Sequence, residues 1–186
     1  QGGSYLLLEV DTTPLINQRL QEKVIKLRDY LKKNNIKYKK LTHNNEKIII
    51  SFKDKEIEKF EEYFLNKDND INYFYNNYRS YEMEYLIENN NFFIEFSKFG
   101  VIEINNSAVD QSLEIVRRRI DEVGTKEPTI IRRGSDRILI ELPGLNDPAR
   151  IKKLLGKTAK LTFRLASVED TEFSSELIPF ENSDEK

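Results

Sequence analysis

Residues 5–11 read Tyr-Leu-Leu-Leu-Glu-Val-Asp, and their side chains alternate between two faces as those of a β-strand do. Leu7 and Glu9 fall on one face, and Thr13 and Pro14 follow, which are typical of the first turn of a helix. The stretch therefore predicts a strand that leads into a helix. The sheet that takes up this strand decides the fold. The opposite face of the strand is aliphatic throughout, with Leu6, Leu8 and Val10.

Strand and helix signals continue along the chain in the order βαββαβ. An apolar stripe predicts an amphipathic helix that ends at Asn34 and Asn35, and Asp54 can cap a second helix. A turn at His43-Asn44-Asn45 separates two strands that lie between these helices. The strands expected in this first unit cover residues 5–11, 37–41 and 47–52, with one or two more around 71–75 and 81–88.

The same order of elements begins again at residue 92. Ser107 can cap a helix that ends at Gly124, and Asp147-Pro148 opens another helix that ends near Gly156. A hairpin turn is expected at residues 134–136. The strands expected in this second unit are 92–97, 129–133, 137–142 and 160–165.

This repeat predicts an α+β protein with two ferredoxin-like βαββαβ units, each an antiparallel sheet with helices on one face. The first unit is rich in Asn and covers residues 1–89, and the second covers residues 90–166. Residues 167–186 hold seven acidic residues and one lysine, which is typical of a solvated linker. A second interpretation places residues 5–11 in the second sheet and makes residues 12–106 an insertion.

The residues that most catalytic and metal sites need are scarce in this sequence. The chain has no cysteine and one histidine, His43, which falls in an Asn-rich turn. Carboxylate pairs such as Glu82/Glu84 fall on outward positions, where nothing buries one carboxyl group to raise its pKa. No glycine-rich loop links a strand to a helix, as a phosphate site requires. The sequence therefore predicts no enzyme activity, no catalytic residue, no metal and no cofactor.

Charge and hydropathy argue against two further classes of protein. The net charge is −2, and residues 1–166 carry a mild +4 because residues 167–186 hold seven acids against Lys186. The strand at 137–142 lacks the aromatic residues of an RNA-recognition motif, and no run approaches the roughly 18 apolar residues that cross a bilayer. We expect no nucleic-acid binding, and a chain that starts at Gln1 as a piece of a longer protein. The arginines of the second unit do not fall on one plane: Arg117, Arg118, Arg119, Arg132 and Arg133.

One feature predicts an interaction surface. Each main strand carries an apolar residue on its nominally outer face, and these four residues are Leu7, Ile49, Phe93 and Leu139. Together they can form a hydrophobic strip where a sheet meets another sheet or domain. The alternative is ordinary β-propensity on a half-exposed surface.

Three blocks of the second unit resemble a known family. Residues 115–128 read IVRRRIDEVGTKEP, residues 134–145 read GSDRILIELPGL, and residues 156–165 read GKTAKLTFRL. In this order they resemble the first periplasmic domain of SecD, a subunit of the bacterial Sec protein-export machinery. Residues 1–11 also resemble the segment after the first membrane helix of SecD, whereas residues 12–106 match only in element order. The motif positions shared with the family are Gly124, Glu127, Pro128, Arg137, Glu141, Pro143 and Gly144.

The resemblance implies a scaffold on the periplasmic side of the bacterial inner membrane. SecD works with SecF and assists the passage of preproteins through the SecYEG channel, using the proton gradient. The resemblance therefore implies SecF, the SecYEG channel and the preprotein as partners, a membrane tether just before Gln1, and a head domain beyond the acidic tail. The alternative function is a small-molecule-binding regulatory domain of the ACT type, which shares the ferredoxin-like order of elements.

Overall fold

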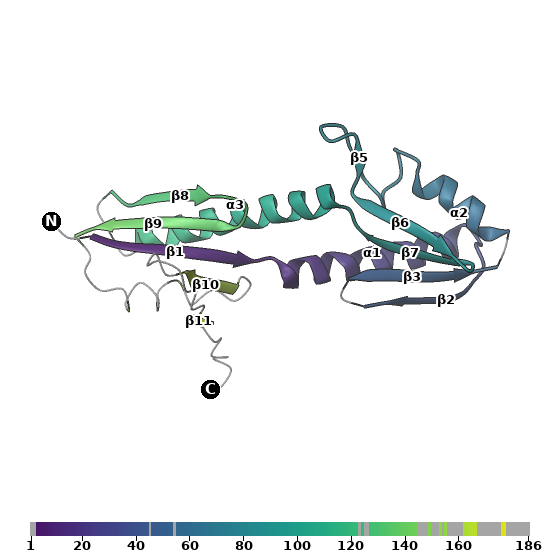
Figure 1. The fold of residues 1–186 in the computed structure, drawn as a ribbon, viewed down its shortest axis with the longest axis horizontal. Helices are drawn as coiled ribbons and strands as arrows, with labels where there is room; N and C mark the ends of the chain where they lie inside the picture. The colour runs from purple at the N-terminus through teal and green to yellow at the C-terminus, as the bar shows by residue number, and fades with distance from the viewer. Residues whose placement is uncertain are drawn as a thin grey trace. The chain divides into compact units, whose positions relative to one another are not determined.

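In the computed structural model the chain has an α+β fold, as the sequence predicts (Figure 1). The chain divides into two compact units. Unit 1 comprises residues 1–12 and 105–186, and unit 2 comprises residues 13–104. The described residues are 3–44, 46–53, 55–122, 124, 127–144, 149, 153, 155, 162–166 and 176–177.

Unit 1 contains an antiparallel five-stranded sheet, called sheet A here, with the strand order β11-β10-β1-β9-β8. In this order β1 lies in the centre, between two strands from the far end of the sequence. The strands are β1 (Gly3–Asp11), β8 (Thr129–Arg133), β9 (Arg137–Pro143), β10 (Thr162–Ala166) and β11 (Glu176–Leu177).

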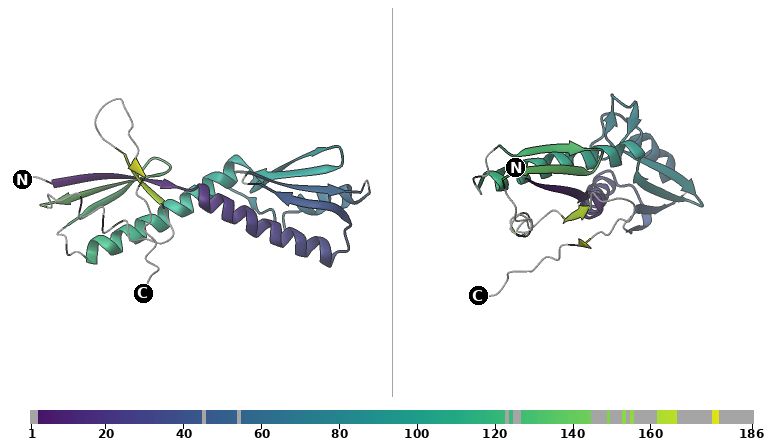
Figure 2. Two further views of the ribbon diagram at one scale, coloured as in Figure 1. Left: turned by 90° about the horizontal axis from the view of Figure 1, so that it is seen from below. Right: turned by 60° about the vertical axis from the view of Figure 1, so that its left-hand side comes forward.

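Helix α3 (Lys98–Glu122) begins in unit 2 and belongs to unit 1 from Asn105 on. The core of unit 1 lies between sheet A and this second part of α3, which runs along one face of the sheet (Figure 2). Arg132 of β8 lies on this inner face, and its Nη2 donates a hydrogen bond to Oδ1 of Asn106 on α3, 2.7 Å away. The helix contributes buried Val109, Val116 and Ile120. The buried inner residues of β1 and β9 pair in register, Leu6 with Ile140 and Leu8 with Ile138.

Unit 2 contains an antiparallel four-stranded sheet, called sheet B, with the order β2-β3-β7-β6, and a small β4-β5 ribbon. Helices α1 and α2 contribute buried residues to one core with the inner face of sheet B. Aromatic rings dominate this core, and Phe60 and Phe92 meet edge to face with centroids 5.0 Å apart. The elements are α1 (Thr13–Lys33), β2 (Tyr38–His43), β3 (Lys47–Phe52), α2 (Glu56–Phe64), β4 (Phe74–Tyr75), β5 (Ser80–Tyr81), β6 (Met83–Glu88) and β7 (Asn91–Phe96).

These two units differ from the division at residues 89 and 90 that the element order predicts. That division falls inside a hairpin, because β6 and β7 pair across the turn Asn89-Asn90. The φ angles of the two asparagines are 48° and 64°, which a type I′ hairpin turn requires and Asn tolerates. The strand expected to open the second unit therefore belongs to sheet B, and β1 belongs to sheet A. The pairings follow the second interpretation, in which the intervening residues are an insertion.

The strand order of unit 1 is ferredoxin-like, whereas the element order of unit 2 is not the one predicted. In unit 1, the first of four strands in sequence, β1, lies between the fourth, β10, and the third, β9, as in a βαββαβ sandwich. The helix expected from Asp147-Pro148 to Gly156 lies largely outside the described residues, so the complete unit stays a prediction. Unit 2 has two helices that each precede a strand pair, which is not the order predicted for residues 1–89. In the predicted tail, β11 pairs with β10, and the other tail residues lie outside the described residues.

Helix α3 begins at Lys98, well before the start predicted at Ser107. Ser97 is the residue that caps it, because its Oγ accepts a hydrogen bond from the Gly100 N–H at 3.0 Å. The same hydroxyl donates to the carbonyl of Tyr81 at 2.7 Å. Ser97 thus fixes both the start of α3 and the strand β5 beside it.

Gly100 explains why the first turns of α3 were hidden in the sequence. A Cβ at this position would stand 2.1 Å from the carbonyl oxygen of Glu82, so the close approach of the two backbones requires glycine. Glycine and the Asn105-Asn106 pair are poor helix formers, and a reading by propensity places a loop there.

We expect Ser97→Ala to lower the free energy of unfolding of unit 2 by about 1 kcal/mol, the usual cost of a lost N-cap. The control variant Ser107→Ala, at the predicted cap, should change the unfolding free energy of unit 2 by less than about 0.5 kcal/mol, because Ser107 lies inside the helix and in unit 1. Urea unfolding followed by tyrosine fluorescence measures both, since every tyrosine except Tyr5 lies in unit 2. Equal losses from the two variants would contradict the capping role of Ser97.

Tyr85 ties β6 to α2 and to the core. Its hydroxyl donates to Oε1 of Glu61 at 2.5 Å, and its ring stacks on Phe92 with centroids 4.6 Å apart. Burial raises the pKa of Tyr85, and the hydrogen bond to the Glu61 carboxylate adds to this, bringing it to about 12. The folded state therefore favours the neutral phenol.

Because the pKa of Tyr85 is raised in the folded state, the stability of unit 2 should fall at alkaline pH. The contribution of neutral Tyr85 is complete below its unfolded pKa of 10.0 and is lost as the pH rises through about 12. We expect Tyr85→Phe to lose less unfolding free energy than the wild type between pH 9 and pH 11.5, by chemical denaturation at each pH. Tyr73→Phe, at a side chain that is 58% exposed, is the control and should follow the wild type. A wild-type pH profile for Tyr85→Phe would refute this linkage.

Candidate interaction surface

The groups that the sequence offers for chemistry are dispersed in the structure. His43 ends β2 with an exposed side chain. Across the described residues, no three side chains of His, Asp or Glu gather as a metal site requires. None of the helices in the described part of the chain is long and apolar enough to cross a membrane.

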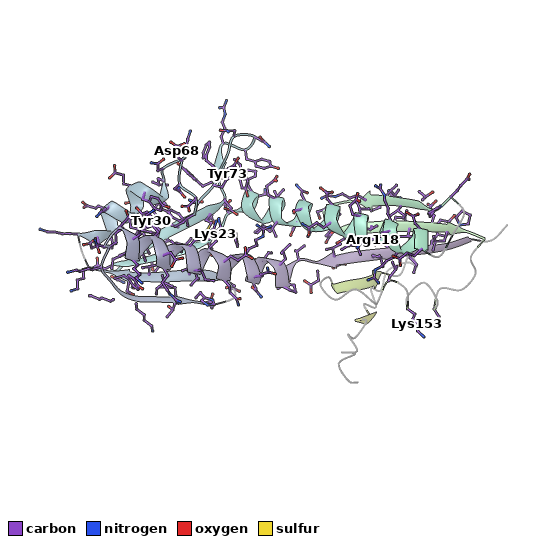
Figure 3. The ribbon with its side chains drawn as sticks, turned by 180° about the vertical axis from the view of Figure 1, so that it is seen from behind. Lys23, Tyr30, Asp68, Tyr73, Arg118 and Lys153 are labelled. Atoms are coloured by element: carbon purple, nitrogen blue, oxygen red, sulfur yellow. The ribbon has the colours of Figure 1, made fainter. Side chains whose placement is uncertain are left out.

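A largely buried ion pair among the described residues joins Lys23 of α1, labelled in Figure 3, to Glu82, just before β6. Their side chains are 11% and 12% exposed, so the prediction of an outward, solvated position was wrong for Glu82. The Lys23 ammonium also donates to the carbonyl of Ile71. The backbone carbonyl of Glu82 accepts from the N–H of Ser97 at 2.9 Å. Each charged group therefore has partners within unit 2, and the pair holds α1 against the segment that leads into β6.

The predicted apolar strip resolves into two pairs on separate sheets. Leu7 and Leu139 are direct partners in sheet A, and Ile49 and Phe93 are direct partners in sheet B. All four side chains are partly buried and lie on the face opposite the core. The pairs belong to different units, so each is a candidate surface by itself.

The pair on sheet A continues into a longer apolar row. Ile131 of β8 is the partner of Leu139 and is 43% exposed. Charged residues flank this row, with Arg137 opposite both Glu9 and Arg133 on one side. An apolar centre with a polar rim is the usual composition of a protein interface. Close to Leu7, a shallow depression of about 360 Å³ is lined by residues 133–137 of the β8–β9 hairpin.

The pair on sheet B also continues into a row. Leu86 of β6 is the partner of Phe93, and its side chain is 56% exposed. The outer faces of β6 and β7 form a groove of about 430 Å³ beside this row. Its lining residues include Lys47, Glu84, Leu86, Glu88, Phe93 and Glu95.

The family-motif residues concentrate at the β8–β9 hairpin and its two ends. Gly124 ends α3 with φ of 67°, and its N–H donates to the carbonyl of Asp121 at 3.0 Å. Glu127, with φ of 49°, and Pro128 lead into β8. In β9, the motif residues Arg137 and Glu141 lie on the outer face, Pro143 pairs with Gly3, and Gly144 follows with φ of 75°. The motif therefore shapes this hairpin and supplies the polar rim of the sheet A row.

The arginines lie on different surfaces, as predicted. Arg132 points to the inner face of sheet A, where its Nη1 lies 3.8 Å from Oδ1 of Asp110, and Arg133 lies on the outer face. Arg118 projects from α3 (Figure 3). These residues do not combine into a single basic plane.

Sequence reasoning missed Leu86 and Ile131, the most exposed members of the two rows. The alternation of Glu84, Leu86 and Glu88 is the signal that could have placed Leu86 on the outer face of β6. Ile131 shares its face with Arg133, and the same period-two rule applies.

Comparison with known proteins gives consistent matches. A family model described as the protein translocase subunit SecDF, P1 domain, N-terminal, matches residues 109–168. SecD of Acetobacter pasteurianus is 38% identical over 168 residues, which is 89% of this chain and 31% of that protein. SecD of Rickettsia prowazekii is 35% identical over 91% of this chain and 32% of its own length, and SecD of Pseudomonas aeruginosa is 32% identical over 91% and 26%.

These matches extend beyond the motif blocks. Alignments that cover 89–91% of the chain include most of unit 2, although the family model covers residues 109–168. The chain spans about a third or less of the length of these relatives. No solved structure matches the chain. The chain therefore belongs to the SecD family, as a segment that includes the N-terminal part of the P1 domain.

Proposed function

We propose that this chain is a non-catalytic scaffold of a SecD-type subunit on the periplasmic side of the bacterial inner membrane. In this proposal the whole subunit assists the proton-gradient-driven passage of preproteins through the SecYEG channel, and SecF is its direct partner. The similar proteins are protein translocase subunits SecD, which supports the general role. Nothing in the matches favours a small-molecule-binding domain of the ACT type.

The observation that carries the scaffold role is the apolar row of sheet A. Leu7, Leu139 and Ile131 run across three neighbouring strands on the face that α3 does not cover. Burying such aliphatic side chains against a partner stabilises a complex by roughly 25 cal/mol per Å² of apolar surface, before the costs of association. Charged residues around the row then orient the partner and penalise mismatched ones.

The backbone pairing that forms the core also sets the position of two members of the row. Leu7 and Leu139 each alternate with buried residues of β1 and β9, so the register of these strands places Leu7 against Leu139. The motif glycines and Pro128 shape the hairpin that carries Ile131. We infer that this face packs against a folded domain of SecF.

Leu139→Glu in the full-length protein tests this proposal. A carboxylate in the centre of the row would lose its water without gaining a partner, and we expect at least a tenfold loss of co-purified SecF, about 1.4 kcal/mol. Preprotein translocation into membrane vesicles should slow in parallel.

Gln111→Glu is the control. Gln111 is exposed on α3, which covers the other face of sheet A, so SecF recovery should stay at the wild-type level. Circular dichroism of both variant chains checks that they fold alike. Wild-type SecF recovery with a folded Leu139→Glu variant would refute docking through this row.

A further inference from the structure

The edge strand β6 of sheet B is closed along one part and open along another. The side chain of Asn72 acts as a neighbouring strand would at Met83: its Oδ1 accepts from the Met83 N–H at 2.8 Å, and its Nδ2 donates to the Met83 carbonyl at 3.2 Å. Asn72 is fully buried and also donates to the carbonyl of Phe64. The edge is therefore covered at Met83.

Further along, the backbone groups of β6 have no such cover. In an antiparallel pair, hydrogen bonds point alternately toward the partner and away from it. Because Met83 points away from β7, Tyr85 and Ile87 also direct their N–H and C=O groups to the free edge. Within the described part of the chain, no group bonds to these four atoms.

The side chains beside this free edge carry a definite pattern. Glu84, Leu86 and Glu88 alternate on the outer face and are all exposed. Leu86 continues the apolar row of Ile49 and Phe93, and the groove of about 430 Å³ lies along the same two strands. The edge thus offers hydrogen bonds, one apolar contact and two negative charges at fixed spacing.

The opposite edge of sheet B, strand β2, has protective features that β6 lacks. Strand β2 has a register shift between Tyr38 and Lys40, and Lys39 and Lys40 are exposed. Bulges and lysines are the usual devices that prevent a strand from pairing with another chain. Strand β6 pairs regularly from Met83 to Glu88 and carries an exposed leucine.

We propose that β6 binds an extended segment of another polypeptide as an added antiparallel strand. The segment carries an apolar residue opposite Leu86 and a lysine or arginine opposite each of Glu84 and Glu88. Such β-addition uses backbone hydrogen bonds for affinity and alternate side chains for selectivity. Tyr85 and Ile87 supply the backbone bonds, and Leu86 with Phe93 supplies the apolar contact.

The charges exclude a second copy of this chain as the occupant. Two β6 strands paired antiparallel through Leu86 would set Glu84 opposite Glu88 on both sides, and like charges directly opposite one another destabilise the pair. A copy's β2 has lysines, but its bulge breaks the regular bonding that β6 offers. The pattern therefore selects a foreign, unfolded, basic and apolar segment.

This inference goes beyond the scaffold role and does not depend on it, because it rests on unit 2 and leaves sheet A aside. Loss of SecF docking through Leu139 would leave peptide binding at β6 intact. Loss of peptide binding at β6 would likewise leave SecF docking through Leu139 intact. The experiments can therefore refute one proposal without refuting the other.

A labelled peptide, Thr-Lys-Thr-Leu-Thr-Lys-Thr, tests the occupant's chemistry on the 186-residue chain. We expect it to bind at least fivefold more tightly than the same peptide with Glu in place of Lys, because two opposite-charge pairs replace two like-charge pairs. In ¹H–¹⁵N spectra the amides of Tyr85 and Ile87 should shift most. No binding, equal binding of the two peptides, or shifts that avoid β6 would overturn the proposal.

Charge reversal gives the sharpest variant. Glu84→Lys with Glu88→Lys should invert the preference, so that the acidic peptide binds more tightly than the basic one. Glu114→Lys with Glu122→Lys changes the net charge equally at exposed positions of α3 in unit 1, and should keep the wild-type preference. Inversion by both double variants would show a net-charge effect and overturn the assignment to β6.

Backbone methylation distinguishes an added strand from a peptide that lies on the face of the sheet. In the added strand, the two threonines next to leucine face Tyr85 and Ile87 and donate to them, whereas the leucine N–H points away. N-methylation of those threonines should weaken binding about tenfold or more, and N-methylation of leucine should leave it unchanged. Equal affinity for both methylated peptides would overturn strand addition.

Discussion

The register between β1 and β9 is the constraint on which unit 1 depends. A slip of one residue would turn Leu6 and Leu8 out of the core and bring Leu7 and Glu9 into it, because side chains alternate with a period of two. Each aliphatic side chain that leaves the core loses roughly 1.5–3 kcal/mol, and a buried Glu9 would need a partner. The same register aligns Leu7 with Leu139 on the outer face. Core and candidate docking surface are therefore specified by one set of backbone pairings.

Local elements could be predicted from the sequence wherever the periodicity was strong. Helix α1 and strands β3, β8 and β9 lie where the apolar patterns place them. Ownership of strands could not be predicted in this way, because the element order repeats and a local pattern does not say which distant strand is the partner. The Asn89-Asn90 turn was the one local signal against the predicted boundary, since it joins β6 and β7 into a hairpin. The start of α3 was hidden for another reason: Gly100 is there for a close backbone contact with Glu82, which overrides helix propensity.

The candidate surface could be predicted in part for the same physical reason. Alternation alone placed Leu7, Leu139, Ile49 and Phe93 on outer faces, and the structure keeps them there. Which of these residues pair depends on the register between strands that are far apart in the sequence. The alternation of side chains within one strand gives no information on that register. The strand predicted around residues 71–75 was wrong at Asn72, which lies before β4. Its amide is fully buried because it replaces the hydrogen bonds of a missing strand at Met83.

The contrast between Asn72 and the rest of β6 bears on how sheet B limits its own interactions. A buried amide that bonds to both the N–H and the C=O of Met83 closes the edge there without adding a strand. Had the whole edge needed protection, a bulge or lysines of the kind found in β2 would have served along its length. Instead the open part coincides with the alternation of Glu84, Leu86 and Glu88, which repels another copy of the same strand. Strand β6 leaves its backbone groups free and limits its partners by the charge of its side chains. Strand β2 has a bulge, which prevents regular pairing by geometry. The two edges of sheet B therefore solve the same problem in opposite ways, and β6 alone remains able to accept a complementary strand.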